Sequence, residues 1–351
     1  MTAVNRRSAT YPIVITGIGP TCPEYFTVAE LLAAPHERAG EPARSMAHFQ
    51  PERFLGKRGF KSLSPATRYA LAAAHVALDD AGLLDTAIYP PESKGVFVGT
   101  NFAVHDVLET MDGFVLSQGA SALFALETPN FSVNIPASHI SMKLGFLAFN
   151  VTLTSMLVAG VEAVMLGAES IRNGRAKLVL AGATEGGMPT AAAALFGAPP
   201  SDGAACMLAL EALPAAQSRG ARIYAQVGPS LLCFIPPDVA GTYASWAPHE
   251  QRLRRALDGL LGDAKPLRLA TFDLGCAFTQ RVNESVLRYW QDHGLSLGLH
   301  ACAAAAADAS VSPLLSLSAS VARHGDALLL VASPQGHVAL LWLEPLGGGR
   351  V

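Results

Sequence analysis

The chain has 351 residues, of which half are hydrophobic and 15% are charged, and its formal net charge is −3. This length suits two ordinary domains or one large duplicated fold with a substantial core. The small net charge without a basic run argues against nucleic-acid binding, and no apolar run is long enough to span a membrane.

The start of the chain and the cysteines suggest a compartment. MTAVNRRSATYPIVITGIGP lacks the long apolar region of a signal peptide and leads into an expected strand at Tyr11–Gly19. The cysteines form neither a CxxC pair nor a regular framework, and their number is odd. We therefore expect free thiols and a reducing, cytoplasmic location. The five residues are Cys22, Cys206, Cys233, Cys276 and Cys302.

Loops and then a long helix are expected after the first strand. Residues 27–60 contain several prolines and charges, which favour surface loops and short helices. From Leu63 the stretch LSPATRYALAAAHVALDDAGLL has helical spacing. Its Ser64–Pro65 pair predicts the start of the helix, and Gly82 predicts its end.

The next elements alternate between strand and helix. KGVFVGT at 94–100 predicts a buried strand, and 103–117 predicts a helix. Residues 150–185 predict a strand, a turn, a helix rich in small residues and a second buried strand. Continuous apolar strands that alternate with helices are typical of an α/β fold whose sheets are covered on both faces.

Two similar segments suggest that the fold is internally duplicated. The segments that start at Gly203 and Gly336 share Gly, Leu, Leu, Glu and Leu at the same offsets, so that Glu211 corresponds to Glu344. Each segment predicts a strand that is entered through a glycine turn and preceded by another buried strand. Two strands in the same order favour a duplicated fold over chance similarity.

The duplication predicts where the chain divides. LPAAQSRG, near 214–220, reads as a polar link between the halves. We therefore expect an N-terminal half at 1–213 and a shortened C-terminal half at 214–351.

Several stretches together resemble the ketosynthases of fatty-acid and polyketide assembly, members of the thiolase-fold superfamily. The resemblance rests on the order and spacing of VITGIGP, RYALAAAHVALDDAGL, GVFVGT, NIPASHISMKLG, ESIRNGRAKLVLAGATE and SDGAACMLALE. It implies an α/β thiolase fold, with a five-layered αβαβα core made of two duplicated halves, that works as a dimer.

The family's nucleophile is a cysteine at a strand-to-helix turn, where the helix dipole favours its thiolate. Seventeen residues before Gly174, this position falls on Leu157, with Met156 and Ser155 as alternative registers. None of the three is a cysteine. The small residues that follow Leu157, from Ala159 on, favour the first register.

Two histidines assist the family's reaction, and their positions are also changed. The resemblance places the first on Asp273, in ATFDLGCAFTQ, and the second near Ala303, in HACAAAAADAS. The glycine-rich loop that closes the family's site is reduced to Ser333–Gly336. Loss of all three groups predicts that this chain does not catalyse condensation.

Other residues offer weaker candidates for chemistry. Cys276 and Cys302 lie near the histidine positions, but we interpret them as small buried residues. We interpret His300 as a surface-loop residue and Asp273 as a turn or capping residue. Ser155 has no base in the family's positions. HDVLET at 105–110 lacks metal-ligand spacing and GIGP lacks the rest of a dinucleotide loop, so we expect no metal and no cofactor.

Ketosynthase-like chains without the cysteine resemble the chain-length factors of type II polyketide systems. The resemblance implies a noncatalytic subunit that forms a heterodimer with an active ketosynthase and meets acyl carrier protein through the complex. The interface is expected at the strand that holds Phe149, Val151 and Leu153. The helix from 106 to 118 resembles the helix that lines the partner's acyl tunnel, with His105, Leu108 and Asp112 on one face.

Those gate positions are smaller or more polar than in aromatic-polyketide systems, which suggests a reduced or polyene chain. Two other classes remain open at this point. One is an independent thiolase-fold acyltransferase or hydrolase with relocated catalytic groups. The other is a homodimeric acyl-binding or scaffolding protein.

Overall fold

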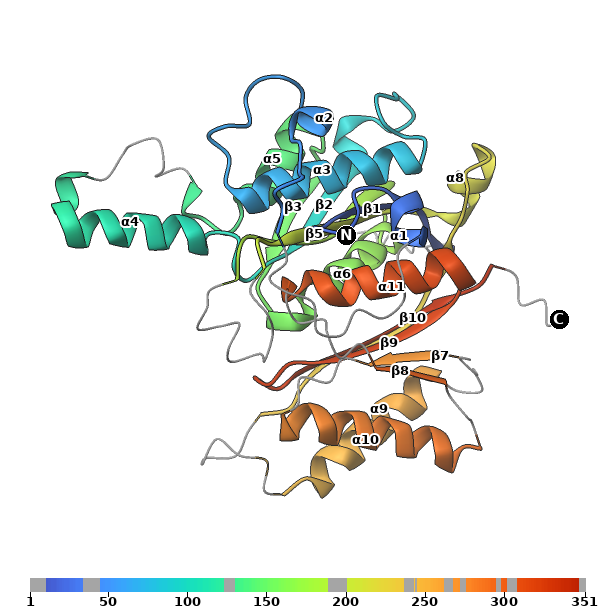
Figure 1. The fold of residues 1–351 in the computed structure, drawn as a ribbon. Helices are drawn as coiled ribbons and strands as arrows, with labels where there is room; N and C mark the ends of the chain where they lie inside the picture. Colours follow the sequence, from blue (N-terminus) through green and yellow to red (C-terminus); the bar gives the residue numbers. More distant parts are fainter. Residues whose placement is uncertain are drawn as a thin grey trace, which may run out of the picture.

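Ten strands form one sheet in the described part of a computed structural model of the chain (Figure 1). The structure describes residues 11–33, 45–122, 130–188, 201–236, 243, 245–261, 268–271, 276–294, 298–301 and 308–346. The strand order is β3-β2-β4-β5-β1-β6-β10-β9-β7-β8. The strands are β1 Ile13–Thr21, β2 Lys94–Gly99, β3 Phe149–Leu153, β4 Leu178–Glu185, β5 Ala204–Ala212, β6 Ala225–Phe234, β7 Arg268–Thr271, β8 Gly298–Ala301, β9 Ala327–Ala332 and β10 His337–Glu344.

The sheet consists of two five-strand halves with the same topology. From one edge, the first half has the order β3-β2-β4-β5-β1. From the opposite edge, the second half has the order β8-β7-β9-β10-β6. When the strands are numbered within each half, both orders are 3-2-4-5-1. The first two adjacent pairs in each half are parallel and the next two are antiparallel. The halves are joined where Ile13–Ile15 pairs with Ala225–Val227. The expected duplication is confirmed, whereas the division at 213/214 stays a prediction.

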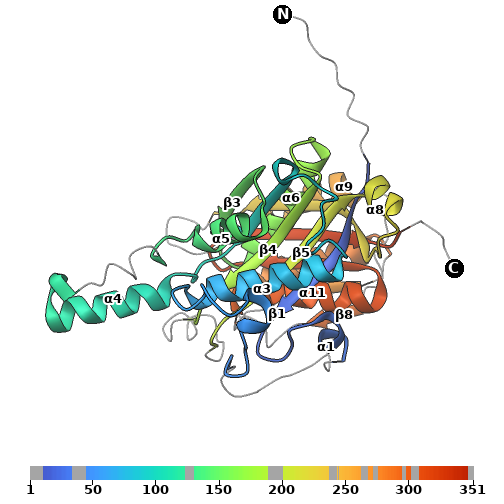
Figure 2. The same ribbon diagram turned by 90° about the horizontal axis from the view of Figure 1, so that it is seen from above.

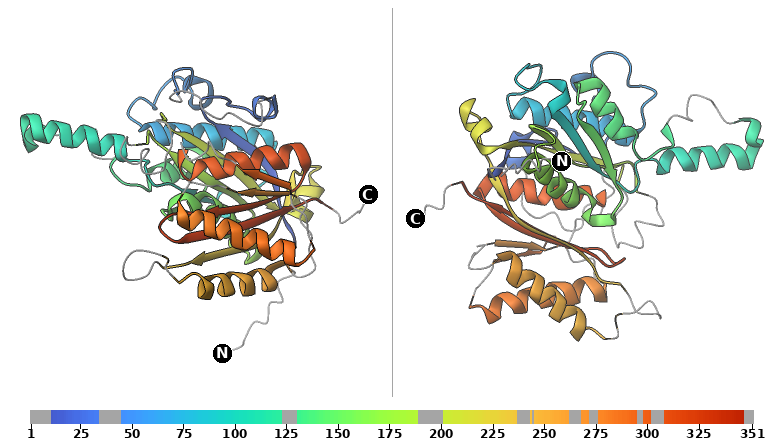
Figure 3. Two further views of the ribbon diagram at one scale, coloured as in Figure 1. Left: turned by 60° about the horizontal axis from the view of Figure 1, so that its bottom comes forward. Right: turned by 180° about the vertical axis from the view of Figure 1, so that it is seen from behind.

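Helices cover both halves and separate them, which gives the expected αβαβα layers (Figures 1 and 3). Helices α3 and α5 pack on the outer face of the first half, and α9 and α10 pack on that of the second. Helices α6 and α11 lie between the two halves of the sheet and form a central core cluster with them. The helices are α1 Val28–Ala33, α2 Glu52–Leu55, α3 Pro65–Asp80, α4 His105–Gln118, α5 Ile135–Leu144, α6 Ala159–Arg172, α8 Leu213–Ser218, α9 Ala247–Leu261, α10 Ala277–Asp292 and α11 Val311–His324, with 3₁₀ turns η1 Pro91–Ser93, η2 Ala120–Ala122 and η4 Met156–Val158.

The predicted start and end of α3 are confirmed. Ser64 is its N-cap, since its side chain accepts a hydrogen bond from the Thr67 N–H, and Pro65 opens the first turn. Gly82 follows the helix with φ +66°. The helix packs so closely on β1 that a Cβ on Gly19 would lie 1.9 Å from the Ala73 carbonyl oxygen. A glycine is therefore required there.

The predicted polar link near 214–220 is wrong, because Leu213–Ser218 forms the short helix α8. Pro214 lies in its first turn, where proline fits, and two alanines and a glutamine continue it. Gly220, at φ +65°, follows its end. The polar composition of the segment concealed its helical propensity.

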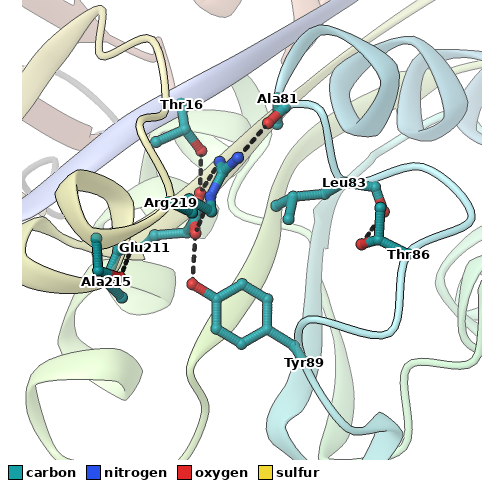
Figure 4. Close-up of polar contacts among 9 residues, drawn as sticks. Thr16, Ala81, Leu83, Thr86, Tyr89, Glu211, Ala215 and Arg219 are labelled. Atoms are coloured by element: carbon teal, nitrogen blue, oxygen red, sulfur yellow. Dashed lines mark hydrogen bonds and ion pairs between the residues drawn. The ribbon is translucent and has the colours of Figure 1, made fainter.

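A buried carboxylate ties α8 to the first half of the sheet (Figure 4). Glu211, near the end of β5, is fully buried and accepts hydrogen bonds from Thr16 Oγ1 and Tyr89 Oη, both at 2.5 Å. Arg219 donates to the same carboxylate from Nη2 at 2.6 Å and from Nε at 3.0 Å. Its Nη1 donates to the carbonyl oxygen of Ala81, at the end of α3, at 2.7 Å. This network holds β1, β5, α3 and α8 together.

Glu211→Gln is expected to lower the free energy of unfolding by about 3–5 kcal/mol, because it leaves the Arg219 guanidinium buried without its counter-charge. Urea denaturation followed by circular dichroism measures the change. The duplicated fold supplies a matched control: Glu344, at the end of β10, is half-buried and accepts one hydrogen bond, from Gln226 Nε2. Glu344→Gln should change stability by no more than about 1 kcal/mol. Equal losses for the two variants would contradict this interpretation.

Candidate functional site

The turn between β3 and α6 has a strained backbone. Met156, in η4, has φ +56°, an uncommon conformation for a side chain of this size. Its carbonyl oxygen accepts a hydrogen bond from Asn101 Nδ2 at 3.0 Å. Strain of this kind costs on the order of 1–3 kcal/mol and persists only where the surroundings impose it. The turn that the resemblance identified is therefore held from outside, by the loop that follows β2.

Leu157 fills the centre of this turn. Its side chain is 3% exposed and belongs to the central core cluster, together with Val158, Ala309 and Leu314. The helix that follows lies close to α11, because a Cβ on Gly160 would be 2.6 Å from the Ser310 carbonyl oxygen. The side chain of Leu157, where the resemblance places the family's nucleophile, is thus apolar and withdrawn from solvent.

Glu185, the last residue of β4, lies beneath the turn and is 1% exposed. Its carboxylate accepts hydrogen bonds from Thr100 Oγ1 at 3.0 Å, Phe102 N at 2.7 Å and Ser310 Oγ at 2.5 Å. Asn101 donates from both its backbone N and its Nδ2. Burial raises the pKa of Glu185, and these donors act in the opposite direction. One carboxylate therefore joins β4, the loop after β2 and the start of α11.

Sequence reasoning missed Glu185. The available signal was a single carboxylate at the end of the continuous apolar strand LVLAGATE. Glutamate is almost never fully buried without partners. Its partners come from residues 100–102 and from residue 310, so no local pattern could have shown them.

A hydroxyl–carboxylate contact lies beside Leu157. Ser155 Oγ donates a short hydrogen bond to Glu162 Oε2, and both side chains are partly buried. The sequence showed no base for Ser155 at the family's histidine positions. Glu162 is not at one of those positions, since it lies on the first turn of α6. Aspartate and glutamate can act as general bases when they reach the hydroxyl proton. This contact gives Ser155 an acceptor for its proton.

The remaining candidate residues near the histidine positions are only partly described. Asp273, Ala303 and Cys302 lie outside the described residues. His300 falls in β8, whose side chains also lie outside them. Cys276 is the N-cap of α10, where it packs against the outer cluster of the second half rather than the central one. The structure therefore does not bring Cys276 and Leu157 into one cluster.

The segment at 333–336 is a tight turn between β9 and β10. The Ser333 N–H donates to the His337 carbonyl at 2.8 Å, and the Gly336 N–H donates back to the Ser333 carbonyl at 2.8 Å. Gly336 has φ +101° and lies close to the Ile235 carbonyl. The turn thus closes the hairpin, and the Gly336 carbonyl also accepts a hydrogen bond from the Ile235 N–H at 2.8 Å.

Helix α4 projects away from the layered core (Figures 1 and 2). Val107 is its one buried residue. Of the predicted gate residues, His105 is partly buried, with its Nε2 3.2 Å from Glu109 Oε1, whereas Leu108 is 42% exposed and Asp112 is exposed. The structure places all three on α4, and their gate role stays a prediction.

The predicted interface strand β3 is an edge strand. It pairs in parallel with β2, and no second strand pairs with it in the described part of the chain. Phe149, Val151 and Leu153 share one face and pack against the central cluster. Large exposed apolar side chains lie nearby, on α5 and on the loop into β3: Met142 is 67% exposed and Leu147 is 62% exposed.

The described residues contain no group of three or more His, Cys, Asp or Glu side chains that could hold a metal ion. No described helix combines the length and the hydrophobicity needed to cross a membrane.

Comparison with known proteins places the chain in a family. The family model "Beta-ketoacyl synthase, N-terminal domain" matches residues 17–198, just over half of the chain. The chain belongs to the beta-ketoacyl synthase family. A putative mitochondrial 3-oxoacyl-(acyl-carrier-protein) synthase of Schizosaccharomyces pombe is 28% identical over 132 residues, which cover 38% of this chain and 31% of that protein.

Bacterial relatives match longer stretches. The 3-oxoacyl-(acyl-carrier-protein) synthase 2 of Vibrio cholerae is 24% identical over 204 residues, 51% of this chain and 49% of that protein. The tetracenomycin polyketide synthase ketoacyl synthase alpha subunit of Streptomyces glaucescens is 29% identical over 269 residues, 63% of this chain and 62% of that protein. The chain thus spans less than two thirds of each of these relatives.

Solved structures share the fold over nearly the whole chain. The ishigamide ketosynthase/chain length factor superposes with a TM-score of 0.80 at 18% identity, covering 97% of this chain and 100% of that one. A second structure is a type II polyketide synthase acyl-carrier protein in complex with its ketosynthase bound to the hexaketide. It superposes with a TM-score of 0.78 at 19% identity, covering 96% of this chain and 100% of that one. These likenesses confirm the thiolase fold of ketosynthases.

Proposed function

We propose that this beta-ketoacyl synthase family member is the noncatalytic, chain-length-factor subunit of a type II polyketide synthase. It pairs with an active ketosynthase and shapes the acyl tunnel at their interface. The observation that carries the proposal is the burial of Leu157, an apolar side chain, at the position where the resemblance places the family's nucleophile. A hydrocarbon side chain has no nucleophilic atom that could attack a thioester. The changed histidine positions, Asp273 and Ala303, support the same conclusion.

The surface around β3 supports a protein partner. Met142 and Leu147 are exposed large apolar side chains near the unpaired edge of β3, and Leu108 is another on α4. Such surfaces mark interaction sites in soluble proteins. Along α4, Met111 and Val115 continue the line from Leu108 at i, i+3 and i+7, the spacing of a helix that docks through one face. Two of the relatives are named as 3-oxoacyl-(acyl-carrier-protein) synthases, and one solved structure holds an acyl-carrier protein with its ketosynthase. In this proposal acyl carrier protein reaches the subunit through the complex.

The contact between Ser155 and Glu162 supports a second candidate, an independent acyltransferase or hydrolase with relocated groups. In that reaction Ser155 Oγ attacks the thioester carbonyl while Glu162 takes its proton. The thiolate leaves as a thiol after receiving that proton, and an ester on Ser155 remains for transfer or hydrolysis. Acyl-ester formation on the isolated chain separates the two candidates.

The isolated chain is expected to be chemically silent, because Leu157, Asp273 and Ala303 supply neither a thiolate nor an imidazole. Mass spectrometry after incubation with an acyl thioester should find no stoichiometric acyl adduct, and malonyl carrier protein should not be decarboxylated. An active ketosynthase is the positive control. An adduct on the wild-type chain that Ser155→Ala abolishes would establish the second candidate instead.

Charges on the exposed apolar residues next to β3 should prevent heterodimer formation. An obligate interface of this kind should bury more than roughly 2,000 Å². Met142→Asp and Leu147→Asp alter exposed side chains, so the chain should still fold while its co-purification with an active ketosynthase is lost. Leu346→Asp, beyond β10, is the control and should leave pairing intact. The proposal would be contradicted if the wild-type chain stayed monomeric when mixed with the ketosynthase that is encoded beside it.

A charge at Val151 or Leu153, which face the central cluster, should remove soluble protein altogether.

The face of α4 that holds His105, Leu108 and Asp112 is expected to limit product length in the heterodimer. Overfilling a packed apolar site costs about 1–3 kcal/mol, and each buried methylene gains only about 0.8 kcal/mol. Leu108→Phe or Leu108→Trp should therefore shorten the products, and Leu108→Ala should lengthen or broaden them, as measured by product mass. Unchanged lengths with bulky replacements at all three positions would place the gate elsewhere.

A further inference from the structure

A pocket of about 200 Å³ lies between the first turn of α3 and the first turn of α4. Arg68 of α3 and Asp106 and Thr110 of α4 line it, together with Lys61 and Asn130 from the adjoining loops. Asn130 Nδ2 donates to the Ser62 carbonyl at 2.7 Å and so holds one wall in place. On α4 these residues lie on a different side from Leu108 and Asp112.

Two side chains of opposite charge in this pocket each have one buried atom without a hydrogen-bond partner. Arg68 Nε is buried and makes no hydrogen bond, and Asp106 Oδ1 is buried and makes none either. No ion pair joins Arg68 to Asp106 in the described part of the chain, although each charge influences the other. Burial raises the pKa of Asp106, whereas nearby backbone N–H groups, His105 and Arg68 lower it. The cation and the anion thus share one cavity without contacting each other.

Buried polar atoms without partners are rare in native proteins, and a solvent molecule or a ligand can supply the missing hydrogen bonds. Burial without a partner costs most for charged side chains. A molecule with one charge matches one of these two side chains and is repelled by the other. A molecule that carries both charges satisfies them together, and the exposed ammonium of Lys61 adds a second cation for its anionic end.

We propose that this pocket binds a small zwitterion of the amino-acid class. Its carboxylate faces Arg68 and Lys61, and its ammonium group faces Asp106. Such a ligand would bridge α3 and α4 and hold the projecting helix at its base. The binding itself is independent of the proposed function, because it needs neither a ketosynthase partner nor an acyl chain.

Isothermal titration of the full chain tests the proposal directly. The probes are glycine, β-alanine and 4-aminobutyrate, which separate the two charges by increasing distances. Propionate and propylamine carry one charge each. We expect at least one zwitterion to bind saturably, about tenfold or more tighter than both single-charge probes. No saturable binding by any zwitterion up to about 10 mM, or equal binding by propionate, would overturn the proposal.

Two variants assign the ends of the ligand. Arg68→Met should weaken binding of the best zwitterion at least about tenfold, since charge-assisted hydrogen bonds are lost. Asp106→Asn should weaken that zwitterion similarly but leave propionate binding unchanged or stronger, because it removes a like charge. Lys57→Met, an exposed cation outside the pocket, is the matched control. Equal weakening of the zwitterion and propionate by Asp106→Asn would overturn the assignment. The comparison of probes on the wild-type chain decides the matter if a variant fails to fold.

Discussion

The close contact between the start of α6 and the start of α11 determines where the rest of the candidate site lies. Gly160 permits it, since any larger residue would meet the Ser310 carbonyl oxygen or the Leu314 side chain. The contact brings Ser310 over the end of β4, where its hydroxyl reaches Glu185. Glu185 in turn holds residues 100–102, and Asn101 holds the strained turn at Met156. The position of Leu157 follows from this series of contacts.

Features encoded within a few neighbouring residues could be predicted from the sequence. Ser64 and Pro65 begin α3 because capping and proline geometry act locally, and the α/β class followed from the alternation of strands and helices. The thiolase fold was implied by the resemblance to ketosynthases. The correspondence of Glu211 and Glu344 anticipated the duplicated sheet. The structure also shows that the two glutamates differ in their partners. Arg219 donates to Glu211, whereas Gln226 donates to Glu344 and no arginine in the described part of the chain does so.

Contacts between distant residues could not be predicted in this way. Glu185 reaches Ser310 across 125 residues, and Arg68 and Asp106 meet in a pocket only because α3 and α4 start side by side. The pair of Ser155 and Glu162 is only seven residues apart, yet a turn of strained geometry separates them, so helix periodicity gave no sign of the contact. In each case tertiary geometry supplies the partner that local pattern lacks.

The free edges of the sheet support an association through β3 more strongly than exposure alone. Strand β6 also has an edge without a neighbour, because β1 pairs only with Ala225–Val227. Pro229 lies in that free part, and proline protects an edge from pairing with another chain. The sequence of β3, FNVTL, contains neither proline nor charge. The free part of β6 therefore carries a protecting proline, whereas the edge of β3, next to Leu147 and Met142, carries none. An unprotected edge with apolar neighbours is a liability unless a partner covers it, and this is the geometry that the proposed heterodimer requires.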